Sequence, residues 1–224
     1  MSKKMKSNLL LLLTAFIWGT AFVAQKSGMD YIGPFTYNGI RTFIGGLVLI
    51  PVIMLLSRGK KEEPALTEAE KQKQNKLLLI GGICCGSVLF VASMLQQFGV
   101  MYTTAGKAGF ITTLYVVMVP IVSVLIGKKV RAIMWLCVAM GAAGLYLLCM
   151  TDASFKLGLG DTLVLLCAVG FTGHIMVIDY FSPKVDGVKL SCLQFFVVSA
   201  VSSVGMLITE QPDIHLILDN WMPI

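Results

Sequence analysis

The chain has 224 residues, of which 56% are hydrophobic and only 13% are charged. Soluble domains carry roughly 25% charged residues, and a soluble fold of this composition would expose large apolar patches. The same composition excludes a disordered, collagen-like or disulfide-dense chain. These numbers indicate an integral membrane protein.

Seven nearly charge-free stretches are long enough to cross a bilayer, for which a helix needs roughly 20 apolar residues. In chain order, the predicted helices cover approximately residues 8–25, 35–56, 77–98, 105–126, 132–150, 161–179 and 190–209. The alternation of apolar and polar residues that marks membrane β-strands does not recur. The predicted fold class is therefore an all-α multi-pass membrane protein.

Two local signals refine this outline. In the longest connection, residues 57–75, Thr67 and Glu70 have the spacing of a capping box, which predicts the start of a short surface helix. Within the spans, Pro51 and Pro120 predict kinks, because proline cannot donate a backbone hydrogen bond. Each kink would free a carbonyl group inside the bundle.

The basic residues set the expected orientation, because cytoplasmic loops collect lysine and arginine. With the amino terminus inside, fourteen of the eighteen basic residues fall in inside segments and three fall outside. The inside set is Lys3, Lys4, Lys6, Arg58, Lys60, Lys61, Lys71, Lys73, Lys76, Lys128, Lys129, Arg131, Lys184 and Lys189. The sequence therefore predicts the amino terminus inside and the carboxyl end outside for seven spans, in the cell (plasma or inner) membrane.

A shift of 153 residues aligns the first predicted helix with the sixth. The matched residues are Leu10, Leu12, Leu13 and Ala15 with Leu163, Leu165, Leu166 and Ala168, and Phe43 with Phe196. Leucine-rich helices also match by chance. Five spans separate the two copies, however, and an odd number makes the second copy enter the membrane from the opposite side. Inverted repeats of this kind recur in secondary transporters, with the substrate site between the copies near the midplane.

Five stretches of the chain resemble one known family. They are Ala-Phe-Ile-Trp-Gly-Thr-Ala-Phe-Val at 15–23, Gly-Ile-Arg-Thr-Phe at 39–43, the run 97–111 continuing to Val119-Pro120, Gly127-Lys128-Lys129, and Gly160-Asp161. In this order they resemble EamA-type members of the drug/metabolite transporter superfamily.

This resemblance implies a ten-helix carrier of two inverted five-helix halves. Residues 1–150 would form the first EamA-type repeat, and residues 151–224 would hold helices six and seven of an incomplete second repeat, three helices short of the family's ten. The implied function is a membrane transporter, exporting small metabolites, amino acids or drugs by alternating access at a central cavity. The alternative is a non-transporting helical bundle, or a partner subunit that needs another chain to complete the carrier.

Polar side chains in the spans suggest where a solute would pass, because they are costly in hydrocarbon and usually face the bundle interior or water. Those in the outer part of the membrane are Lys26, Arg41, Lys107, Gln25, Asn38, Gln96 and Gln97. Asn38 and Arg41 share one helical face, and Lys107 adds its charge to the positive amino terminus of its helix. Together these residues predict an electropositive vestibule for a carboxylate or phosphate.

Each of these residues also has a structural interpretation. Arg41 can extend to the headgroups or pair with Asp30, Lys107 can anchor its helix at the interface, and Gln96 and Gln97 can bond to neighbouring helices. The same two possibilities hold deeper in the membrane. There Trp18 and Tyr115 are candidates to contact the solute and His174 to relay protons, with core packing or a hydrogen bond to a neighbour as the alternatives.

The candidate substrate-binding residues are therefore Trp18, Asn38, Arg41, Gln97, Lys107, Tyr115 and His174. No enzyme is expected, because no nucleophile–base pair or metal-ligand cluster lies within the spans. No cofactor is expected either, since the six cysteines lack the CxxC spacing of a metal or redox site. The expected partners are a small polar or anionic solute and the lipid bilayer, with self-association left open and no nucleic acid.

Overall fold

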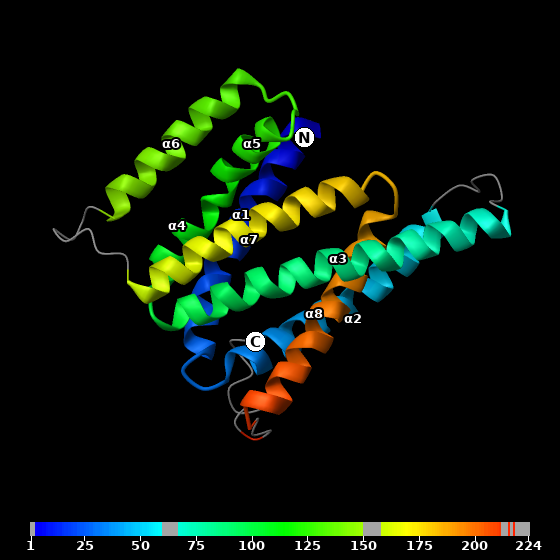
Figure 1. Ribbon diagram of the computed structural model, residues 1–224, viewed down its shortest axis with the longest axis horizontal. Helices are drawn as coiled ribbons and strands as arrows, with labels where there is room; N and C mark the ends of the chain where they lie inside the picture. The colour runs from blue at the N-terminus through cyan, green and yellow to red at the C-terminus, as the bar shows by residue number, and fades with distance from the viewer. Residues whose placement is uncertain (1–2, 60–66, 150–157, 212–214, 216, 218–224) are drawn as a thin grey trace.

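The computed structural model describes residues 3–59, 67–149, 158–211, 215 and 217, and every regular element in this part of the chain is a helix (Figure 1). The helices are α1 (Lys3–Gly28), α2 (Pro34–Gly59), α3 (Glu68–Met101), α4 (Ala105–Thr113), α5 (Tyr115–Leu125), α6 (Ala132–Cys149), α7 (Leu159–Phe181) and α8 (Gly187–Thr209). The predicted all-α fold class is confirmed. Each predicted helix has its counterpart, and α4 and α5 together occupy the fourth.

Six helical stretches are long and apolar enough to cross a membrane, when α4 and α5 are counted as one. The remaining helix, α6, contains a shorter apolar stretch, Ala132–Gly144. The described residues are therefore those of a multi-pass membrane protein. The orientation and the inverted repeat stay predictions.

The third helix starts at Glu68 and not near residue 77. The predicted capping box is present, since Glu70 donates its backbone N–H to Thr67 Oγ1 at 3.4 Å and accepts the Thr67 N–H at 2.9 Å. It opens α3 itself, because no glycine or proline between Glu68 and Ile80 ends the helix before the apolar span begins. At 1.5 Å per residue, α3 is about 50 Å long and exceeds the hydrocarbon core.

The fourth span is broken at Leu114, between α4 and α5. Here the Leu114 N–H bonds three residues back, to the Ile111 carbonyl at 3.1 Å. The Thr113 hydroxyl bonds the Gly109 carbonyl at 2.7 Å, a contact that bends helices. This break, which was not predicted, lies six residues before Pro120, and the kink at Pro120 itself stays a prediction.

The best-packed part of the molecule is a group of four helices. The longest of them, α3, packs along α7 and α8, and α8 packs along α2. Helices α4 and α5 lie on α7, and α1 lies mainly on α4 (Figure 1). The α6 helix lies against α5 and α4, at the margin of the bundle (Figure 1). This arrangement leaves α1 exposed on most of its surface.

Contacts between α2 and α8 are reciprocal under the 153-residue shift. Ser199 donates its hydroxyl to the Gly39 carbonyl at 3.0 Å, and Cys192 donates its thiol to the Gly46 carbonyl at 3.5 Å. Under the shift, Gly39 corresponds to Cys192 and Gly46 corresponds to Ser199. The Ser199–Gly39 contact therefore corresponds to the Cys192–Gly46 contact. This is the pattern that a local two-fold axis produces.

The helix ends agree with this pattern. The last residue of α1, Gly28, shifts onto Phe181, the last residue of α7, and the first residue of α2, Pro34, shifts onto Gly187, the first of α8. Phe43 and Phe196, which the shift also pairs, lie with their ring centroids 6.1 Å apart. These correspondences support the predicted inverted repeat.

Candidate solute-binding site

A cleft of ≈ 630 Å³ separates α1 from α4 and α5, and we call it the solute cleft. It brings together Trp18 and Tyr115, two of the predicted site residues, and the break at Leu114 lies in its wall between Thr113 and Tyr115. Trp18 is 51% exposed, so its indole is available to a ligand. The lining residues are Leu11, Thr14, Ala15, Trp18, Gly19, Phe22, Val23, Ala105, Gly106, Gly109, Phe110, Thr112, Thr113 and Tyr115.

Glycines keep the solute cleft open. A Cβ atom added at Gly19 or at Gly106 would meet no other atom within 4 Å, so these two residues face empty space from opposite walls. At Gly109 the same atom would lie 3.3 Å from the Phe22 ring. The cleft therefore combines aromatic walls with room for a ligand.

A buried network of amides lies behind the solute cleft. Gln25 donates to Gln97 at 2.5 Å and to Gln96 at 3.3 Å, and Gln96 donates to the Thr112 hydroxyl at 3.2 Å. These bonds join α1, α3 and α4. Gln97 is fully buried and does not line the cleft, so its position fits the structural interpretation of a bond between helices.

A second hollow, of ≈ 590 Å³, lies at the amino terminus of α4, and we call it the outer pocket. It is adjacent to the solute cleft, since Ala105 lines both. Lys107 lines it, and within the described part of the chain the ammonium group of Lys107 makes no hydrogen bond or ion pair. Asp161, on the opposite side, accepts from the Thr103 hydroxyl at 2.6 Å.

Lys26 also lines the outer pocket but has a structural partner. Its ammonium group donates to the carbonyls of Val100 and Met101, both at 2.9 Å. These carbonyls belong to the last turn of α3, which has no partners within its own helix. Lys26 therefore caps α3, and Lys107 is left as the cation that can receive an anionic solute.

Arg41 and Asn38 lie in a different part of the molecule from the outer pocket. Asn38 is fully buried and donates to Ser93 at 3.1 Å and to Ser202 at 3.0 Å, which ties α2 to α3 and α8. Arg41 shares its face as predicted, with Nη2 3.5 Å from Asn38 Oδ1 and Cζ 5.5 Å from the centroid of the Tyr37 ring. Neither residue lines the solute cleft or the outer pocket.

His174 lies between α7 and α8, where its Nε2 is 3.0 Å from Gln194 Oε1. Its side chain is buried, with 7% exposed, and it does not line the solute cleft. This position fits the interpretation of a histidine bonded to a neighbouring helix.

Sequence reasoning missed part of the solute cleft. Phe22 is four residues after Trp18 and so shares its helical face, which is a signal that was available. Gly106 and Gly109 are small residues close to Lys107 in the sequence. Their sequence neighbours, however, do not indicate that these glycines face α1.

Comparison with known proteins agrees with this architecture. Residues 5–150 match the model of the EamA-like transporter family. An uncharacterized transporter of Archaeoglobus fulgidus is 30% identical over 204 residues, which are 90% of this chain and 58% of that protein. The uncharacterized transporter YvbV of Bacillus subtilis is 26% identical over 176 residues, 78% of this chain and 48% of the relative.

A second Bacillus subtilis relative, the uncharacterized transporter YetK, is 23% identical over 195 residues, 84% of this chain and 56% of the relative. The chain thus spans about half the length of the curated relatives it matches. No solved structure gives a significant match. The family model matches more than half of the chain, and six helical stretches are suited to cross a bilayer. The chain therefore belongs to the EamA-like transporter family and is a multi-pass membrane protein.

Proposed function

We propose that the solute cleft binds a small organic solute with an apolar body and an anionic or polar group, such as a metabolite, an amino acid or a drug. The observation that carries this proposal is that Ala105 lines both the cleft and the outer pocket, which places the two hollows next to each other. The aromatic rings of Trp18, Phe22 and Tyr115 would contact the body of the solute. The ammonium group of Lys107 would hold its charged end, helped by the positive amino terminus of α4.

The proposed direction is export through the plasma membrane by alternating access. The inverted repeat would let two half-bundles rock about a site near the midplane. The break at Leu114 lies in the wall of the solute cleft, and irregular backbone at membrane depth is tolerated where it lines a cavity. Main-chain carbonyls at the end of α4 would then be available to the solute.

The alternative function is that of a subunit that needs further helices or another chain to complete the carrier. One observation favours it: the α1 wall of the solute cleft is open, since Leu11, Trp18 and Val23 are each at least half exposed. Self-association would be one way to cover this wall.

A transport assay tests both functions. The chain alone is reconstituted in proteoliposomes, and efflux of radiolabelled amino acids and aromatic carboxylates is measured with and without Lys107→Ala. We expect a KM at least several-fold higher for anionic solutes in this variant, and no change in Lys129→Ala, which removes an exposed lysine far from the cleft. Efflux that is equal in both variants would contradict the role of Lys107, and no efflux from the unmodified chain would favour the subunit function.

A further inference from the structure

A carboxylate joins α2 to α8 at the predicted outer end of the helix pair. Glu210 is the first residue after α8, and it accepts the backbone N–H of Phe35 and that of Thr36, both at 2.8 Å. The Thr36 hydroxyl donates to the same carboxylate at 2.6 Å. We call Glu210, Phe35 and Thr36 the outer clasp.

The charge of Glu210 suits α2 and not its own helix. A negative charge at the carboxyl end of α8 is unfavourable with the dipole of that helix, whereas the amino terminus of α2 attracts an anion and has unpaired N–H groups. Hydrogen bonds to a charged acceptor are also stronger than neutral ones. The carboxylate therefore stabilises the contact between the two helices.

Two glycines let the helices close on this carboxylate. A Cβ atom on Gly33 would lie 2.2 Å from Glu210 Cδ, and one on Gly205 would lie 2.4 Å from the Phe35 ring. No side chain larger than hydrogen fits at either position without displacing the outer clasp. The outer end of the α2–α8 pair is therefore shut.

The inner end of the same pair has the opposite form. Under the 153-residue shift, Glu210 corresponds to Ser57 and Gly33 to Asp186. Ser57 donates to the carbonyl of Met54 in its own helix at 2.8 Å, and Asp186 accepts from the N–H groups of Val188 and Lys189 in its own helix. The amino terminus of α8 is thus capped by its own Asp186, and not by a residue of α2.

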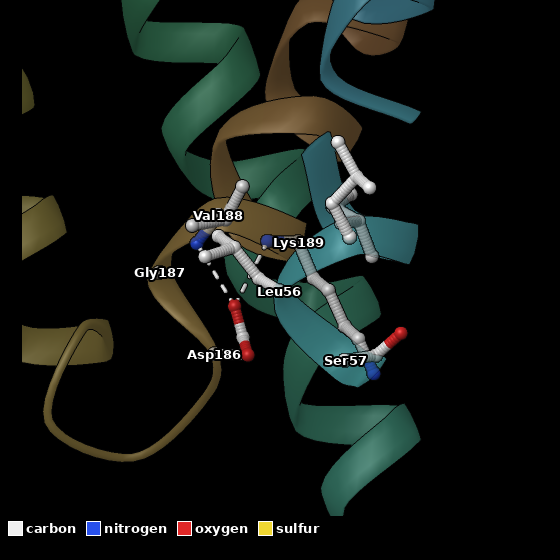
Figure 2. A pocket seen from close by; sticks show the side chains of 8 residues that line it. Leu56, Ser57, Asp186, Gly187, Val188 and Lys189 are labelled. Carbon is white, nitrogen blue, oxygen red and sulfur yellow. Dashed lines mark hydrogen bonds between the residues drawn. The ribbon is translucent and has the colours of Figure 1, made fainter. Parts of the chain in front are cut away.

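A cleft of ≈ 590 Å³ separates the two helices at this inner end, and Figure 2 shows Leu56 and Ser57 of α2 facing the start of α8 across it. We call it the inner cleft; its lining is Ile53, Leu55, Leu56, Ser57, Asp186, Gly187, Val188 and Lys189. The structure therefore holds one end of the helix pair shut and the other end open.

We propose that the outer clasp is the outer gate of the carrier. When Glu210 is bound to Phe35 and Thr36, the outer end of α2–α8 is shut and the inner cleft is open. When Glu210 is released, the outer end opens and the inner cleft closes. This inference rests on the proposed function, since a gate has meaning only for transport by alternating access. Glu210 is partly exposed, so water can replace its three hydrogen bonds when it leaves.

The competing interpretation is that Glu210 only ties the two helices together. The gate and the tie differ in what they predict for the inner end of the helix pair when Glu210 is replaced. If Glu210 only holds the bundle together, its loss loosens both ends. If it is a gate, its loss exposes the outer end and covers the inner cleft. Accessibility at the two ends, measured in one variant, therefore distinguishes them.

The experiment uses the full chain with its six cysteines replaced by serine or alanine and one reporter cysteine in each sample. Ser203→Cys reports on the outer half of α8, where the Ser203 hydroxyl would be 3.8 Å from a Cβ at Gly39. Ser57→Cys reports on the inner cleft. A membrane-impermeant maleimide is applied to the matching side of oriented vesicles, without any solute, and the labelling rates are measured.

We expect Glu210→Gln to raise labelling of Ser203→Cys about tenfold and to lower labelling of Ser57→Cys by a similar factor. A tenfold change corresponds to ~1.4 kcal/mol, close to the lower limit for a hydrogen bond to a charged group, and the amide of glutamine can still accept a weaker bond. Thr36→Val removes one of the three bonds and should give a smaller change in the same directions. The matched control is Asp30→Asn, which removes an exposed carboxylate at the same end and should leave both rates unchanged.

Unchanged rates in Glu210→Gln, or rates that rise at both ends, would overturn the gate. Size-exclusion chromatography of each variant checks that it is folded, and Thr36→Val provides the same test if Glu210→Gln is not. Because labelling needs no solute, this result is independent of the efflux assay. Opposite changes at the two ends with no efflux from the unmodified chain would favour the subunit function and leave the gate standing.

Discussion

In the core of α2, α3, α7 and α8, glycine has the opposite role from the one that it has in the solute cleft. In the core, a Cβ atom on Gly160 would lie 2.6 Å from the backbone carbon of Tyr102, and one on Gly86 would lie 2.7 Å from Val197. In the cleft, Gly19 and Gly106 face empty space. Glycine therefore brings backbones together in the core, as small residues do in membrane bundles, and keeps volume free in the cleft.

Polar side chains divide in the same way. In the core, Asn38 and Ser202 bond across helices, and no buried side-chain nitrogen or oxygen in the described residues lacks a partner. Beside the cleft, the ammonium group of Lys107 makes no bond within these residues. The comparison indicates that polar side chains in the core tie helices to one another, whereas Lys107 has no such partner among the described residues.

The largest effect is expected for Gly160→Val. The added atoms would meet the backbone of α3 at Gly99 and Tyr102, and backbone cannot move aside as a side chain can. We expect a loss of about 3 kcal/mol or more in the free energy of unfolding, measured by denaturation in detergent micelles. Gly106→Ala is the matched control and should keep the stability of the parent chain; equal losses in the two variants would remove the distinction between core and cleft.

A smaller loss of stability is expected for Asn38→Leu. This change removes the bonds to Ser93 and Ser202 and the contact with Arg41, and together these should cost about 1–2 kcal/mol. The same denaturation assay measures it. Thr20→Val removes a hydroxyl that bonds only within α1 and should change little; a loss as large as that of Asn38→Leu would contradict the assignment of Asn38 to the core.

Filling the cleft should affect transport and leave stability intact. Gly106→Leu places a side chain in the empty space opposite Trp18, and we expect the efflux rate to fall about tenfold with stability within about 0.5 kcal/mol of the parent. Ala142→Leu adds a similar volume on the exposed surface of α6 and should leave both unchanged. Normal efflux in folded Gly106→Leu protein would show that the solute passes elsewhere.

The smallest effect is expected for Lys26→Met. This variant compares Lys26 with Lys107, the two lysines that line the outer pocket. Loss of the cap on α3 should cost about 0.3–1 kcal/mol of stability with no change in the KM for an anionic solute. A rise in KM equal to that of Lys107→Ala would assign both lysines to the solute.

The helices were predictable because the length of a charge-free stretch is a local property of the sequence. The early start of α3 was also within reach, since Thr67 and Glu70 form the expected capping box. The break at Leu114 was not, because no glycine or proline marks it: there the Leu114 N–H bonds three residues back and the Thr113 hydroxyl bonds its own backbone. The kink at Pro120 stays a prediction.

For the candidate site, the sequence gives the position of each residue along its helix but not the direction in which its side chain points. Position along a helix gives the distance of Lys26, Arg41 and Lys107 from the membrane surface, but it does not give the rotation of the helix or its neighbours. As a result, three cations at similar depth have three surroundings: the end of α3, the side chains of α2, and the outer pocket. Tertiary contacts alone separate them.

The contact between Phe43 and Phe196 has a mechanical consequence. It lies midway along the α2–α8 crossing, between the outer clasp and the inner cleft, and the two rings meet edge to face at 74°. If the proposed gate operates, this contact would be the pivot: a small tilt about it would separate one pair of helix ends and bring the other pair together, while the rings stay in contact. In the proposed alternating access, the protein would then change the side that it opens without breaking the middle of the α2–α8 pair.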